Sequence, residues 1–147
     1  MNTQDQEFKD YESFSRRMEE KFPKMFANKY GGFACGKGWW PLLEQLCGTI
    51  QHHIDWREKQ GNPIPQVVIE QIKEKFGTLR FYYQGGDDYI SGAVSFAENV
   101  TDQLCEECGD AGTRRSGGWI RTLCDKHEAE RQEQLRTIEM KSSGFEE

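Results

Sequence analysis

Residues 105–127 read CEECGDAGTRRSGGWIRTLCDKH. Cys105 and Cys108 stand three positions apart, and Cys124 and His127 repeat this spacing at the end of the stretch. Side chains at that spacing can meet at one point, so each pair supplies half of a tetrahedral metal site. Three thiolates and an imidazole are a ligand set of structural zinc sites, in which protein fills every coordination position. The sequence therefore predicts one structural zinc ion, Zn²⁺, held by these four residues.

The fifteen residues between Cys108 and Cys124 include four glycines, which suit a short β-hairpin. Cys124 and His127 fit the first turn of a helix that follows. A knuckle, a hairpin and a ligand-bearing helix together form a treble-clef-like element. Iron is a weaker alternative because the histidine favours zinc. Without a metal, the stretch would be a chance cluster of small buried thiols beside an exposed histidine.

The rest of the chain shows both helical and strand periodicity. Phe76-Gly77 is a turn signal between two strand-like runs, which predicts a β-hairpin. The expected elements in chain order are a helix within 1–22, a loop over 24–38, a helix over 41–59, a strand over 64–75, a strand over 78–83, a helix over 87–104 and a polar helix over 125–140.

The expected fold is α+β, with N-terminal helices, a β-hairpin packed by a helix, and a C-terminal zinc element with a closing helix. We divide the chain into an α+β core, residues 1–104, and the zinc element with its C-terminal helix, residues 105–147. Because the predicted helix over 87–104 runs directly into Cys105, we expect the two parts to form one continuous unit.

Composition excludes several protein classes. The chain has 147 residues, 12% of them aromatic, and a net charge of −6. Its aromatic content argues against disorder, and no apolar run approaches the roughly 18 residues of a membrane helix. The polar, acidic N-terminus and the odd number of cysteines, five, predict a reducing compartment rather than a secreted disulfide framework. We expect Cys35 and Cys47 to pack in the core; the alternative is a second metal site or a redox thiol.

Nucleic-acid binding is one functional alternative. The zinc stretch carries Arg114, Arg115 and Arg121 with Trp119 among them, and arginine beside an aromatic ring can contact phosphate and stack on a base. Four basic and four acidic side chains balance within residues 105–127, however. A solvated element with a locally basic tip, or a protein contact through the same four residues, explains this pattern better.

Sequence motifs of enzymes are absent. There is no GxGxxG, GxxxxGK[ST], GxSxG or HExxH pattern. A nuclease of the HNH type would need a general-base histidine between Cys108 and Cys124, and that stretch has none. His52 and His53 stand near Asp55 on the predicted helix over 41–59, which is more typical of a solvent-facing pair than of a catalytic site. We therefore predict a protein without enzymatic activity.

A ligand pocket is a third possibility, because planar rings can stack on a nucleotide base and cationic side chains can bind its phosphate. The alternative is that these side chains fill the core and its rim. The six candidate residues are Trp39, Trp40, Lys75, Arg80, Tyr82 and Tyr83.

Three stretches together resemble a pattern of small uncharacterised proteins of bacteriophages and prophages. They are GKGW at 36–39, KEKFGTLRFYY at 73–83, and a third that begins AE at 97 and continues through CEECG to GWIRTLCDKH at 118–127. The resemblance implies a phage origin and the shared zinc element. From the phage context and the reduced cysteines we expect a place in the cytoplasm of the bacterial host. Small phage proteins in that compartment often bind a host or defence component.

The function we expect is that of a phage-encoded, zinc-stabilised binding protein that modulates a host or anti-phage defence protein. The first alternative is a nucleic-acid-binding zinc protein. The second is binding or cleavage of a nucleotide signal at the hairpin aromatics. No membrane partner is expected.

Overall fold

Three segments that are distant in the sequence form the larger sheet of the computed structural model, which describes residues 2–145. β2 (Val68–Lys75) lies in the middle, antiparallel to β3 (Thr78–Gln84) and parallel to β1 (Phe33–Ala34). The smaller sheet is the hairpin of β4 (Thr113–Arg115) and β5 (Arg121–Leu123). Among the described residues the fold is therefore α+β, with four α-helices and two small sheets.

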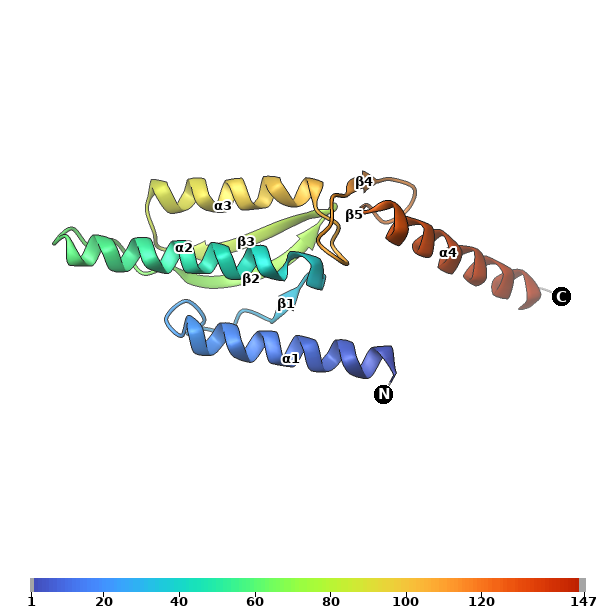
Figure 1. The fold of residues 1–147 in the computed structure, drawn as a ribbon, viewed down its shortest axis with the longest axis horizontal. Helices are drawn as coiled ribbons and strands as arrows, with labels where there is room; N and C mark the ends of the chain where they lie inside the picture. The colour runs from blue at the N-terminus through green and yellow to red at the C-terminus, as the bar shows by residue number, and fades with distance from the viewer. Residues whose placement is uncertain (1, 146–147) are drawn as a thin grey trace.

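Three of the four helices lie around the larger sheet (Figure 1). The four are α1 (Thr3–Lys21), α2 (Trp40–Lys59), α3 (Asp88–Val100) and α4 (Asp125–Phe145), with short 3-10 turns at Lys37–Trp39 and Thr101–Gln103. α1, α2 and α3 lie around β2 and β3, whereas α4 leads away from the rest of the molecule. None of the described helices is both long and apolar enough to span a membrane.

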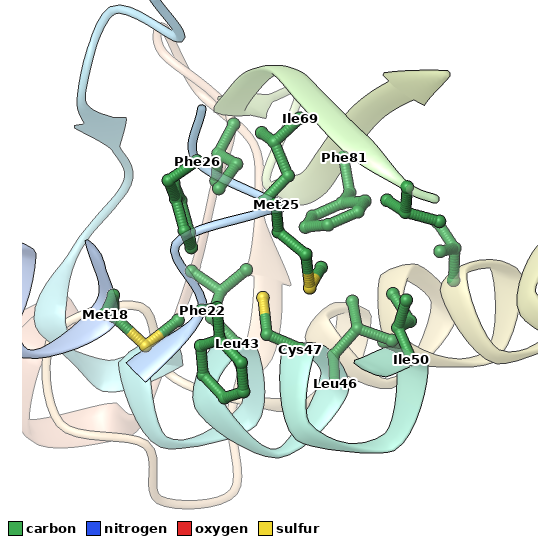
Figure 2. Close-up of a cluster of buried hydrophobic side chains, with 14 of the residues drawn as sticks. Met18, Phe22, Met25, Phe26, Leu43, Leu46, Cys47, Ile50, Ile69 and Phe81 are labelled. Atoms are coloured by element: carbon green, nitrogen blue, oxygen red, sulfur yellow. The ribbon is translucent and has the colours of Figure 1, made fainter. Parts of the chain in front are cut away.

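The core fills the space between the sheet and the first three helices. Met25, Leu46, Ile50, Ile69 and Phe81 point toward one another from four segments of the chain (Figure 2), and all are buried. Each large side chain taken from water in this way contributes about 1.5–3 kcal/mol. The apolar residues that recur with helical or strand periodicity in the sequence therefore lie on the faces of the helices and strands that pack in the core.

Several features differ from the sequence-based expectations. The strand predicted over 64–75 begins at Val68, and the helix predicted over 87–104 ends at Val100 and gives way to a 3-10 turn before Cys105. The loop predicted over 24–38 contains β1, because Phe33 and Ala34 pair with Ile72 and Lys73 of β2. A two-residue strand carries no periodic signal, so only its distant partner reveals it. The helical spacing of Phe8, Phe14 and Met18 predicts one apolar face of α1; Phe14 and Met18 are buried, but Phe8 is 63% exposed.

Hydrogen bonds from backbone and side-chain donors tie residues 104–123 to the core. The Gly38 N–H donates to the Glu106 carbonyl at 2.8 Å, and the Thr122 hydroxyl donates to the Gly77 carbonyl at 2.7 Å. The Trp39 indole N–H donates to the Leu104 carbonyl at 3.0 Å. The Cys/His element thus rests on both the entrance to α2 and the β2–β3 turn.

Candidate functional site

The four predicted ligands converge. Cys105 and Cys108 come from the turn after α3, Cys124 follows β5, and His127 lies in the first turn of α4. Their nearest ligand atoms all lie within 4.8 Å of one another. The cluster can therefore hold a metal ion, and we call it the Cys₃His cluster.

The separations match a tetrahedral ion. Bonds of about 2.3 Å to sulfur and 2.0–2.1 Å to nitrogen imply about 3.8 Å between two sulfurs and about 3.6 Å between sulfur and nitrogen. The Cys108 and Cys124 Sγ atoms are 3.8 Å apart. The His127 Nδ1 atom lies 3.5 Å from Cys105 Sγ and 3.2 Å from Cys124 Sγ. Four protein atoms occupy all four corners, as in structural rather than catalytic sites.

His127 faces the cluster through Nδ1, which leaves Nε2 for a second contact. The Glu130 carboxylate lies 3.8 Å from that Nε2 on the next turn of α4. At 3.8 Å the contact is longer than a hydrogen bond, so Glu130 is an ionic neighbour of the imidazole. α4 therefore supplies both a ligand and a nearby negative charge.

The turn that carries the first two cysteines is a tight knuckle. The Gly109 N–H donates to the Cys105 carbonyl at 2.8 Å, and the Cys105 N–H donates to the Asp110 carbonyl at 2.7 Å. Gly109 has a φ of +80°, a conformation that other residues adopt at a cost. Glycine after the second cysteine thus lets the chain close around the two sulfurs.

The environment of the sulfurs suits a cation. Burial raises the pKa of Cys105, but hydrogen bonds from backbone N–H groups, that of Cys124 foremost, outweigh burial and lower the pKa to about 7. At Cys108 the Asp110 N–H lowers the pKa, but desolvation and the neighbouring sulfurs raise it to about 11. Two thiolates this close repel each other, and a divalent cation between them removes that repulsion.

Two glycines upstream fit against the knuckle. A Cβ atom at Gly38 would clash with the Cys105 carbonyl and lie 2.6 Å from the Gly109 nitrogen, and one at Gly36 would clash with the Glu106 carbonyl. The Gly36 N–H also donates to the buried Glu106 carboxylate at 2.8 Å. No periodic pattern predicts this role for the GKGW stretch, although two glycines separated by one residue are a signal of close backbone contact.

Arg115 and Arg121 are engaged within the chain. Arg115 lies 2.8 Å from an Asp125 carboxylate oxygen and also donates to the Leu123 carbonyl. Arg121 lies 2.7 Å from a Glu107 oxygen. Their charges are neutralised locally, so these two guanidinium groups hold the element together.

Arg114 and Trp119 remain free for external contacts. Both are exposed, and Arg114 has no ionic partner among residues 2–145. The Trp119 side chain is 74% exposed, while its carbonyl accepts a hydrogen bond from the Arg131 guanidinium of α4. The helix thus restrains the backbone that presents the indole.

Trp119 borders an apolar hollow beside the β2–β3 turn. We call this the aromatic hollow; it is lined by Glu74, Lys75, Phe76, Gly118, Trp119 and Ile120. Phe76 is itself 56% exposed. Two distant loops therefore place two exposed rings against one surface depression, and no sequence pattern links them.

The structure does not bring the six predicted pocket residues together. Trp39 is fully buried, and Trp40 stacks on Phe14 of α1 with ring centroids 4.7 Å apart. Lys75, Arg80, Tyr82 and Tyr83 do line one hollow, together with residues of α3. The two tryptophans open α2 and turn into the core, which separates them from the hairpin.

The histidine pair has a partner other than the predicted one. His52 is exposed, whereas His53 Nε2 lies 2.8 Å from a carboxylate oxygen of Asp87, not of Asp55. Arg57 contacts the same oxygen at 3.1 Å. This cluster joins α2 to the start of α3.

The remaining cysteines are separate from the metal cluster. Cys47 is fully buried in the core and Cys35 is half-buried. Burial raises the pKa of Cys35 to about 12, so its thiol stays neutral. Among the described residues, only the Cys₃His cluster gathers three or more possible metal ligands of these types.

Comparison with protein-family models, with curated proteins and with solved structures gives no significant match.

Proposed function

We propose that this chain is a zinc-stabilised binding protein without enzymatic activity, and that the aromatic hollow is its contact surface for a protein partner. The Cys₃His cluster supports the first part, because protein atoms fill all four corners and leave no open position for substrate. Three sulfurs and one imidazole nitrogen favour zinc over cations that prefer oxygen ligands.

The observation that carries the binding surface is the backbone of Phe76. Phe76 and Gly77 both have positive φ, 53° and 82°, and Lys75 pairs with Thr78 across them. This is a two-residue turn of type I′, whose first position favours asparagine. A bulky residue there costs roughly 1–2 kcal/mol. The fold therefore keeps a strained, exposed ring where a polar residue would be more stable, which is a mark of a functional position.

Trp119 supports the same surface independently. Large aromatic side chains in apolar depressions are the side chains that contribute most to protein–protein binding. The Cys₃His cluster and α4 hold the β4–β5 loop so that Trp119 lies beside Phe76. Zinc would thus act on binding indirectly, by holding one half of the contact surface.

The test is affinity capture with the full chain as bait, from lysate of the cells in which the protein is made, with and without nuclease. The wild-type chain should retain a protein in stoichiometric amount in both arms. Phe76→Asn and Trp119→Ala should each lose it, whereas Phe96→Ala should not, since Phe96 is an equally exposed ring on α3. Phe76→Asn should also raise the unfolding free energy by about 1 kcal/mol.

That combination separates binding from folding, because a variant that is more stable yet no longer binds has lost a contact and not its structure. Capture that survives both substitutions, or that disappears on nuclease treatment, would contradict the proposal. A phage origin and a host or defence protein as partner remain predictions from the resemblance.

A further inference from the structure

The register of the β2–β3 hairpin places two positive charges directly opposite each other. Lys73 pairs with Arg80 across the antiparallel strands, so both side chains project from the same face of the sheet. Like charges in directly opposite positions destabilise a sheet. Lys75 projects from that face too, one pleat further along β2, about 6.7 Å from Lys73.

These cations have no acidic partner in the described part of the chain. Among residues 2–145 no ion pair involves Lys73, Lys75 or Arg80. Arg57 and Arg121, by contrast, are each paired with a carboxylate. The three charges on this strand face are therefore unbalanced in a chain whose net charge is −6.

The same face lies away from the core. Leu79 and Phe81 turn inward and are buried, so the alternate residues Arg80 and Tyr82 turn to the opposite side. Tyr82 is 42% exposed and borders two hollows, one shared with Lys75 and Arg80 and the other with Lys29. We call Lys73, Lys75, Arg80 and Tyr82 the basic strand face.

The acidic groups near this face leave the charges free. A Glu98 carboxylate oxygen borders the same hollow but accepts the Phe81 backbone N–H at 2.9 Å, which holds it at the strand edge. Glu70 lies at the far end of β2, next to the register shift, in the hollow that Lys29 lines. The centre of the face, between Lys73 and Arg80, remains positive.

We propose that the basic strand face binds single-stranded nucleic acid, independently of the aromatic hollow. Lysine and arginine at regular spacing along and across two strands suit a ligand with a repeated negative charge, whose binding releases counterions. The exposed Tyr82 ring offers a stacking surface for a base, and Gln71, opposite it in register, offers an amide to a base edge. An ordered stacking ring argues for a nucleic acid over an acidic peptide.

The test is fluorescence anisotropy with labelled 15-nucleotide dT and rU oligomers. Three phosphate contacts predict that affinity falls roughly 20-fold between 50 and 200 mM salt. Lys73→Gln/Arg80→Gln should weaken binding at least tenfold and flatten the salt dependence. Lys9→Gln/Arg16→Gln, which removes the same charge from α1, should change affinity less than twofold. Tyr82→Ala should weaken binding about fivefold without changing the salt slope.

Folding and binding are separable in this experiment. Because Lys73→Gln/Arg80→Gln removes a repulsion, its melting temperature should equal or exceed that of the wild-type chain. Absence of oligonucleotide binding at 50 mM salt would overturn the proposal. So would equal weakening in the α1 control, or binding of a 14-residue Asp/Glu peptide in place of both oligomers. None of these outcomes bears on protein capture through Phe76 and Trp119.

Discussion

At the scale of single residues, the positions that break a local rule are the informative ones. Phe76 occupies a backbone conformation that suits asparagine, and Lys73 faces Arg80 without an intervening acid. Gly38 is the reverse case, since only a residue without a side chain fits between α2 and the knuckle. A residue that disagrees with the local preference for backbone conformation, charge pairing or side-chain size does so where a tertiary contact or a function requires it. Sequence periodicity does not reveal that requirement.

Gly38→Ala should therefore be severe. The added methyl group would meet the backbone of Cys105 and Gly109, which cannot move without opening the knuckle. We expect loss of at least 2 kcal/mol of unfolding free energy and weaker metal retention. The control is Gly92→Ala, because Gly92 lies within α3 with open space around it. That change should raise stability by about 0.5–1 kcal/mol.

Thermal unfolding with metal analysis checks both variants. A Gly38→Ala variant that melts at the wild-type temperature and keeps its metal would show that the knuckle does not need this glycine.

At the scale of elements, Asp87 links two helices. One of its carboxylate oxygens caps α3 through the Ile90 N–H at 3.1 Å, and the other accepts hydrogen bonds from His53 and Arg57 of α2. Desolvation alone would raise the pKa of Asp87, but the His53 and Ile90 hydrogen bonds and the Arg57 charge outweigh it. The pKa therefore lies below its ordinary value.

This shift predicts a pH-dependent contribution to stability. A carboxylate with a lowered folded-state pKa stabilises the fold above its unfolded-state pKa of about 4, and the contribution disappears as pH falls through the folded-state value. Asp87→Asn keeps a capping side chain but removes the charge. It should cost about 1 kcal/mol at pH 7, and the difference from wild type should shrink below pH 4.

Denaturant unfolding at a series of pH values measures this difference. Asp88→Asn serves as the control, because Asp88 is the exposed neighbour of Asp87 in the first turn of α3. An Asp87→Asn cost that persists unchanged at pH 3 would show that the carboxylate charge is not its source.

At the scale of the whole molecule, the Cys₃His cluster and the core support each other. Residues 105–127 contribute few large buried side chains, so a bound metal ion would supply much of the stabilisation of this stretch. Hydrogen bonds from Gly38 to Glu106 and from Thr122 to Gly77 transmit that stabilisation to α2 and the β2–β3 turn. Losing the ion should therefore affect residues far from the ligands in sequence.

Wild-type protein purified without chelator should hold about one zinc ion per chain. The Cys124→Ser variant should release that metal. The variant should melt at a lower temperature, and the Gly38 amide should exchange its hydrogen faster, because its acceptor belongs to the knuckle. Cys35→Ser is the control, since Cys35 lies outside the cluster and should leave the metal content unchanged. Elemental analysis and amide exchange measure these effects. A metal-free wild-type chain of equal stability would remove the zinc assignment.

The sequence by itself determined the helices, the β2–β3 hairpin and the four residues of the cluster. These depend on short-range spacing: 3.6-residue and two-residue periods, and two pairs of ligands three positions apart. The identity of the ion is predicted by the ligand types, and the cluster that could bind it is present in the structure.

Only the tertiary structure decided which distant segments meet. It paired β1 with β2, placed Gly36 and Gly38 on the knuckle, and brought Phe76 beside Trp119. Each of these contacts joins residues at least 39 positions apart. Such contacts depend on how packed elements orient one another, which leaves no periodic trace in the chain. The physical reason is that spacing along a helix or strand is set by local geometry, whereas contact across the molecule is set by packing of the whole core.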